Sequence, residues 1–180
     1  MDQKPQRRES RMWRIELTRF DEFARGGDDV RMVRTDDAVQ LGALFFTAFK
    51  GTTDDLQQTE ADYRAKTNAL FEGLYGDCIL AASSVVERDG ELLSACVVTD
   101  YEPYDCPLIA IVATRPSIQG NGMASSLVKA SLRNLVIAGH SACCAMITVG
   151  NGPSERLFER CGFVPRNIAP AGMRTIDSRP

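Results

Sequence analysis

The sequence predicts a mixed α/β fold in which helices pack on a central sheet. Two observations lead to this fold class. Apolar residues recur at helical spacing in the first half of the chain, and β-branched apolar runs follow them. A strand then runs into a glycine-containing loop and a further helix. With 180 residues, of which 44% are hydrophobic, the chain can bury the core of one domain.

The first 29 residues are predicted to form an N-terminal extension, and residues 30–180 the folded domain. The extension is highly charged and ends in a breaker at residues 25–29, which contains two glycines. Its apolar residues fit both a strand period of two and a helical period, so an ordered element is expected whose type stays open. These apolar residues are Trp13, Ile15, Leu17 and Phe20.

A brief strand and two helices are predicted next. The strand candidate spans residues 30–34, and the first helix follows Asp37, a residue type that caps helices, and ends before Gly51. The second helix is predicted over residues 54–74 because apolar residues recur there at intervals of seven and four. Gly76 is expected to end it.

The strands of the sheet are predicted after Cys78. Asp89-Gly90 lies between two β-branched runs, which is a strong signal for a two-residue hairpin. A third strand is predicted over residues 107–114, and a helix runs from the glycine loop to about Ala138. The remaining predicted elements are a strand over residues 142–149 and a short helix over residues 153–161.

Composition excludes several classes of protein. The formal charge of −3, from 21 basic and 24 acidic side chains, argues against a nucleic-acid partner. No apolar run approaches the roughly 20 residues of a membrane span, so no membrane association is expected. The N-terminus lacks the apolar stretch of a secretory signal, and we expect a cytoplasmic protein.

The six cysteines are interpreted as reduced core residues rather than as a disulfide framework or a metal site. They form no CxxC pair, and the chain has a single histidine, so no metal is expected. Cys143 and Cys144 should face opposite sides of a strand. His140 could activate one of them as a nucleophile, but a histidine just past a helix C-terminus more readily interacts with the helix dipole.

The most informative segment runs from the predicted strand through Gly120 and Gly122 into a helix. The first turn of a helix has unpaired N–H groups and partial positive charge, so it can bind a phosphate. Glycine lets the backbone approach phosphate oxygens closely. On their own, two glycines before a helix are more often explained by tight strand-to-helix packing than by a ligand, and neither a dinucleotide fingerprint nor a P-loop is complete.

Two motifs together resemble the GNAT superfamily of acetyl-coenzyme A (acetyl-CoA)-dependent N-acetyltransferases. Gln119-x-x-Gly122-x-Ala124 is similar to the superfamily's pyrophosphate-binding pattern. The segment 151–163 looks like its closing motif, with Asn151, an apolar-aromatic pair and Gly162-Phe163. The resemblance covers roughly four-fifths of the chain. It implies a mixed, mostly antiparallel sheet with helices on both faces and two strands that splay at the cofactor site.

The resemblance also implies the residues that bind acetyl-CoA. The strand residues Val112, Ala113 and Thr114 would offer main-chain groups to the pantetheine arm. The loop and helix start would hold the pyrophosphate through Gln119, Gly120, Asn121, Gly122, Met123 and Ala124. Asn151 would line the gap between the splayed strands. From the sequence alone, Asn151 could equally be a turn residue that satisfies its own backbone.

The implied reaction is direct attack of a primary amine, on a small molecule or a protein, on the acetyl thioester. Many superfamily members have a tyrosine acid in the closing motif, where this chain has Phe158, and some have a glutamate base where it has Leu108. The nearest carboxylates are Asp105, Glu102 and Asp100, of which we expect Asp105 as the base, although a residue of this kind in a loop is more often simply solvated. A non-catalytic acyl-CoA-binding module is the alternative function. Exposed edge strands make a homodimer possible.

Overall fold

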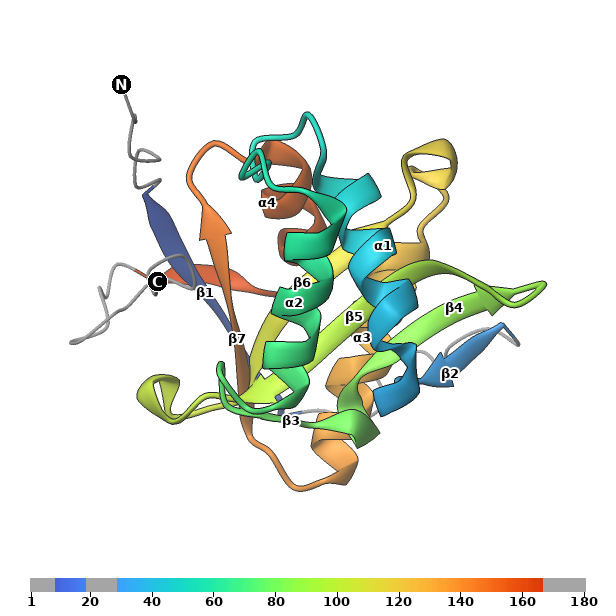
Figure 1. The fold of residues 1–180 in the computed structure, drawn as a ribbon. Helices are drawn as coiled ribbons and strands as arrows, with labels where there is room; N and C mark the ends of the chain where they lie inside the picture. Colours follow the sequence, from blue (N-terminus) through green and yellow to red (C-terminus); the bar gives the residue numbers. More distant parts are fainter. Residues whose placement is uncertain (1–8, 19–28, 167–180) are drawn as a thin grey trace.

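The structure, a computed structural model, describes residues 9–18 and 29–166. Eight strands of these residues form one sheet, in the order β2-β4-β5-β6-β7-β1-β8, with the short β3 paired to β5 (Figure 1). All pairs are antiparallel except β6 with β7. The strands are β1 (Ser10–Glu16), β2 (Val30–Met32), β3 (Asp77–Cys78), β4 (Ser84–Arg88), β5 (Glu91–Asp100), β6 (Leu108–Thr114), β7 (Ala142–Thr148) and β8 (Val164–Arg166).

Helices cover both faces of this sheet. On one face, α1 (Ala38–Phe49) and α2 (Glu60–Phe71) pack over β4, β5 and β6 around Phe45, Tyr63 and Leu70. On the other face, α3 (Met123–Ile137) and α4 (Gly152–Arg160) bury their apolar sides in a second cluster. The predicted fold class is therefore confirmed: the sheet is mixed, mostly antiparallel and covered by helices on both sides.

Local turn chemistry explains why several elements begin and end where predicted. Asp89 and Gly90 both have positive φ, as a two-residue hairpin requires, and they join β4 directly to β5. Gly139, with φ +87°, ends α3. Cys143 and Cys144 lie in core clusters on opposite faces, as the strand period predicts.

Strand β1 corrects the expectation that residues 1–29 lie outside the core. Ser10–Glu16 pairs with β7 on one side and with β8 on the other, and Leu17 is 6% exposed. The ambiguous apolar pattern is thus a strand. The predicted breaker lies outside the described residues except for Asp29, and we propose that the domain includes the described part of this segment.

Helix α2 is shorter than predicted. It begins at Glu60 rather than at Asp54, because Thr59 caps it reciprocally with Asp62: the Thr59 hydroxyl accepts from the Asp62 N–H, and the Asp62 carboxylate accepts from the Thr59 N–H at 2.8 Å. Gln57, with φ +56°, lies in the turn before this cap. Residues 54–58 therefore form a loop between α1 and α2.

Asp37 stands at the predicted N-terminal boundary of α1, but its carboxylate does not cap the helix. It accepts two hydrogen bonds from the Arg31 guanidinium, at 2.7 and 2.8 Å, and one from the Arg34 N–H at 2.8 Å. Burial raises the pKa of Asp37, but the bonds from Arg31 and Arg34 outweigh it and hold the pKa below its usual value. The residue ties β2 to the start of α1.

Candidate active site

The parallel strands β6 and β7 are paired only where they begin. Their ladder consists of Leu108 with Cys144 and Ile109 with Ala145. At that point β6 carries a bulge: Ile109 and Ile111 have consecutive partners on β5, so Ala110 is an extra residue. Beyond it the two strands separate toward their carboxyl ends. The expected splay of two parallel strands is therefore present.

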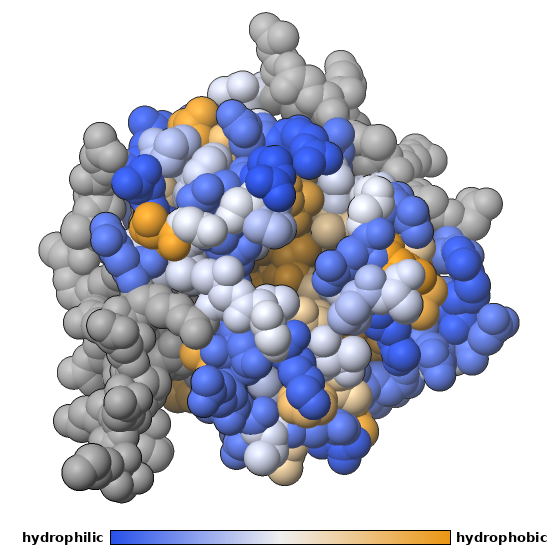
Figure 2. Space-filling model, turned by 90° about the horizontal axis from the view of Figure 1, so that it is seen from above, coloured by the Kyte–Doolittle hydropathy of each residue, from blue (hydrophilic) through white to orange (hydrophobic). Residues whose placement is uncertain are grey.

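The separation opens at the upper end of the molecule in Figure 1. Seen from that end, the surface is hollowed, with hydrophobic side chains at the bottom of the hollow and hydrophilic ones around it (Figure 2). The central residues of β6, Ala110, Ile111 and Val112, are only partly buried. An extended ligand could lie along this edge of β6, because the ladder to β7 has ended.

The glycine loop lies beyond the carboxyl end of β6. Gly120 and Gly122 have φ of +84° and +79°, a region that suits glycine, and an added Cβ at either position would meet nothing within 4 Å. Residues 119–122 are exposed. The loop therefore faces open space. The tight-packing explanation of the two glycines would instead require packed protein around them, so it does not apply here.

Helix α3 starts at this loop without a side-chain cap. Its N-cap residue is Gly122, which has no side chain that could accept a hydrogen bond from the first turn. The N–H groups that begin an α-helix need an acceptor, so the first turn, which includes Met123 and Ala124, is suited to an anion. Gln119 turns its amide inward: Nε2 donates to the Thr114 carbonyl at 3.1 Å and braces the loop against β6.

The end of β6 is held firmly from its other side. The Ser94 hydroxyl on β5 donates to the Ala113 carbonyl at 2.9 Å and lies 2.7 Å from the Thr114 hydroxyl. Ala113 and Thr114 are buried, whereas Val112 is half-buried. β5 thus fixes this strand, while its opposite edge stays open to the gap.

Asn151 occupies the turn between β7 and α4. Its Oδ1 accepts from the Ser154 N–H at 3.2 Å and so caps α4, which matches the turn-residue alternative. Its Nδ2 donates to Asp54 Oδ2 at 2.6 Å. The side chain is thus committed to two protein partners, and its contact with a cofactor stays a prediction.

Asp54 is the residue of this region that the sequence analysis missed. It belongs to the α1–α2 loop and lies 97 positions from Asn151 in the chain. The hydrogen bond joins the loop of one helical layer to the start of a helix in the other. A local pattern carries no signal for such a contact, and the prediction of a helix from residue 54 concealed it.

The two positions where the superfamily often has an acid and a base are both buried. Phe158 is 5% exposed and packs edge-on against Phe163, with ring centroids 5.0 Å apart. Leu108 is 2% exposed and lies between Thr99 of β5 and Cys144 of β7. Both side chains belong to the core.

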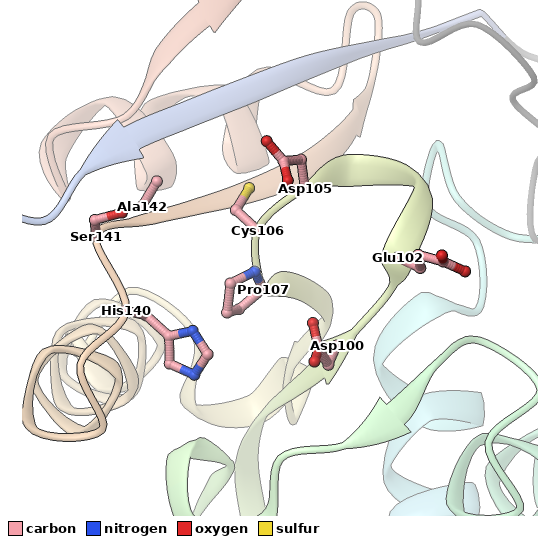
Figure 3. Close-up of a pocket in the computed structure, with 8 residues that line it drawn as sticks. All are labelled: Asp100, Glu102, Asp105, Cys106, Pro107, His140, Ser141 and Ala142. Carbon is pink, nitrogen blue, oxygen red and sulfur yellow. The ribbon is translucent and has the colours of Figure 1, made fainter.

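Asp105, the predicted base, lies at the opposite end of β6. It precedes the strand, whereas the glycine loop follows it, and it has the left-handed conformation that closes a short turn, with φ +54°. It precedes Ala110 by five positions, which is at most about 16 Å of extended chain. Asp105 faces a cavity at that lower end (Figure 3). Its role as a base stays a prediction, and its distance from the gap between β6 and β7 argues against that role.

Two other kinds of site are not found among the described residues. In the described ranges 9–18 and 29–166, no three histidine, cysteine or acidic side chains gather as metal ligands would. None of the helices in these ranges has the length and apolar character needed to cross a membrane.

Comparison with known proteins finds one matching family and several solved structures of similar fold. Residues 85–168 match the family described as FR47-like protein. No curated protein matches the chain. Among solved structures, a GCN5-related N-acetyltransferase from Sphaerobacter thermophilus superposes with a TM-score of 0.65 at 14% identity, over 88% of this chain and 49% of that one.

Two further structures have the same fold. A GNAT-family acetyltransferase from Novosphingobium aromaticivorans has a TM-score of 0.56 at 17% identity, over 88% of this chain and 61% of that one. The diaminobutyrate acetyltransferase EctA from Paenibacillus lautus, in complex with L-2,4-diaminobutyric acid and coenzyme A, has a TM-score of 0.53 at 15% identity, over 73% and 72% of the two chains.

The chain spans only about half to three-fifths of the length of the first two of these structures. The similarity nevertheless extends over 88% of this chain in both cases. The chain therefore has the fold of the GNAT-family acetyltransferases, and its residues 85–168 match the FR47-like family.

Proposed function

We propose that this protein binds acetyl-CoA and transfers the acetyl group directly to a primary amine. One observation carries the proposal: an uncapped helix start with two open glycines lies at the mouth of the gap between β6 and β7. The amides from Gly120 to Ala124 would hold the pyrophosphate, and the free edge of β6 at Val112–Thr114 would hold the pantetheine arm. The thioester would then lie near the bulge at Ala110.

The chemistry needs little from side chains if the amine arrives neutral. The amine nitrogen attacks the thioester carbonyl, a main-chain N–H near Val112 stabilises the oxyanion, and coenzyme A leaves as a thiolate. A thiol with a pKa of about 8.5 leaves tolerably near neutral pH without an acid. Freeing a lysine-like amine at pH 7 costs roughly 4 to 5 kcal/mol, and an α-amine only about 1.4 kcal/mol.

The apolar hollow assists this step, because a low-dielectric environment disfavours the ammonium form of an amine. EctA, which has the same fold, binds a diamine substrate together with coenzyme A, and this supports an amine as the acceptor here. A small molecule and a protein amine both fit the proposal.

A non-catalytic acyl-CoA-binding module is the second candidate. It is favoured by the burial of Phe158 and Leu108, which leaves the two usual proton-transfer positions in the core. Under this proposal the same loop and gap bind the thioester, and no acceptor reacts.

One experiment separates the two functions. Purified protein is incubated with acetyl-CoA and a panel of small amines and peptides, and free thiol is measured over time, while calorimetry measures coenzyme A binding. Accelerated thiol release with one member of the panel supports the transferase. Tight binding with no release on the whole panel supports the binding module, and no binding of coenzyme A contradicts both.

A further inference from the structure

The lower end of the molecule has a cavity of about 350 Å³ that the proposed acetyl transfer does not use. It lies where β6 and β7 begin, at the opposite end from the glycine loop. The turn that enters β6 forms one side, and the segment from α3 into β7 forms the other (Figure 3). The lining residues are Asp100, Glu102, Asp105, Cys106, Pro107, His140, Ser141 and Ala142.

Cys106 links this cavity to a second cysteine and to an arginine. In the sheet, Arg14 of β1 lies opposite Cys144 of β7, which in turn lies opposite Leu108 of β6, so the three side chains share one face. Cys106 precedes Leu108 by two residues and packs in the same cluster as Cys144. Arg14 reaches across this row, and its Nη1 donates to Cys106 Sγ at 3.4 Å.

The environment of Cys106 favours its thiolate. The hydrogen bond from Cys144 and the charge of Arg14 lower the pKa of Cys106 against its burial, while the charges of Asp105 and Glu16 oppose this effect. The same interaction and burial raise the pKa of Cys144. Of the two cysteines, Cys106 is the one that lines the lower cavity.

Cys78 provides the natural comparison within the chain. It is the one cysteine of the six that is not buried, so it would react first if exposure governed reactivity. Burial nevertheless raises the pKa of Cys78, and no cation contacts its sulfur in the described residues. The two cysteines therefore differ in what would promote their reaction. Cys78 is partly exposed, whereas the Cys106 sulfur accepts a hydrogen bond from the Arg14 guanidinium.

We propose that the Arg14–Cys106–Cys144 cluster is a reactive thiol site for small hydroperoxides, separate from the acetyl-transfer site. The Cys106 thiolate attacks the terminal peroxide oxygen, an S–O bond forms, and the O–O bond breaks. The terminal oxygen stays on sulfur, which is oxidised by two electrons to a sulfenic acid. The leaving alkoxide or hydroxide takes up a proton and becomes an alcohol or water. Arg14 holds the thiolate in the reactive form, and the cavity admits the oxidant.

The test measures each cysteine separately and needs no acetyl-CoA. Reduced full-length protein at pH 7 is treated with limiting hydrogen peroxide and dimedone, which traps sulfenic acids, and each cysteine peptide is quantified by mass spectrometry. We expect the adduct at Cys106 to exceed that at Cys78 by about tenfold. Faster modification of Cys78 would overturn the proposal.

Two arginine variants and one control decide whether Arg14 is responsible. Arg14→Gln should slow the Cys106 reaction severalfold, and Arg14→Lys, which keeps the charge, should restore part of the rate. Arg11→Gln removes the same charge from an exposed position on the other face of β1 and should change nothing. Thermal unfolding first verifies that Arg14→Gln and Arg11→Gln are both folded. Equal rates of Cys106 oxidation in the two variants would then also overturn the proposal.

Discussion

The two ends of the β6–β7 pair are built in opposite ways. At the lower end the strands are hydrogen-bonded, and the paired residues Leu108 and Cys144 are buried. At the upper end the ladder has stopped and the surface is hollow. The groups available there to bind a ligand are the backbone amides at the start of α3. One pair of strands thus supplies rigidity below and an opening above. The bulge at Ala110 marks the change.

The largest expected effect comes from placing a side chain in the upper loop. Gly122→Val forces a β-branched residue into a left-handed conformation and puts methyl groups where phosphate oxygens would approach. Losing two charge-assisted amide bonds should weaken coenzyme A binding by on the order of 100-fold, measured by calorimetry.

Gly139→Val is the matched control for this variant. Gly139 has φ +87° and equally open surroundings, but it lies at the other end of α3. Both variants should lose similar stability in thermal unfolding, and only Gly122→Val should lose affinity. Equal affinities would remove the distinction between the two ends of the molecule.

Phe158→Tyr asks whether the upper end lacks an acid because of residue type or because of burial. Phe158 is packed against Phe163, so the added hydroxyl should find no partner and cost about 1 to 3 kcal/mol. Thermal unfolding should show this loss with no rise in kcat. A higher kcat at unchanged stability would mean that position 158 faces the reacting thioester.

The hydrogen bond between Asp54 and Asn151 ties the α1–α2 loop to the upper opening. Asp54→Ala should lower the free energy of unfolding by about 1 kcal/mol, because a part-buried hydrogen bond to a charged group is lost. A double-mutant cycle with Asn151→Ala separates this contact from the capping of α4. Additive losses in the cycle would show that the two side chains do not cooperate.

The smallest effect is expected at the lower end. Because Asp105 lies on the far side of the paired segment from the opening, Asp105→Asn should change kcat for any active amine by less than about twofold. Steady-state rates across pH would measure this. A fall of about 100-fold would instead identify Asp105 as the base and bring the lower end into the reaction.

Local patterns predicted the parts of this molecule that local chemistry determines. Asp89-Gly90 and Gly139 require particular backbone conformations, and the structure has them. The glycine loop was predicted with its helix because the strand, loop and helix are continuous in the chain. Its openness could not be predicted, since it depends on what the rest of the molecule leaves uncovered.

Other features depend on residues far apart in sequence. The period of residues 10–17 fits a strand or a helix, and only pairing with β7 and β8 decides between them. The start of α2 is set by Thr59 and Asp62, which compete successfully with the apolar spacing that suggested residue 54. The cluster around Cys106 needs three strands to assemble, so the sequence showed only scattered cysteines.

The position of β1 also bears on how the chain acquires its structure during synthesis. Ser10–Glu16 is synthesised before both of its partner strands, Ala142–Thr148 and Val164–Arg166, so neither edge can pair until those segments have been made. Contacts between such distant segments close late and slow the search for the native state. Until then the nascent strand exposes Trp13 and two unpaired edges. During this time it can pair with other chains or bind a chaperone.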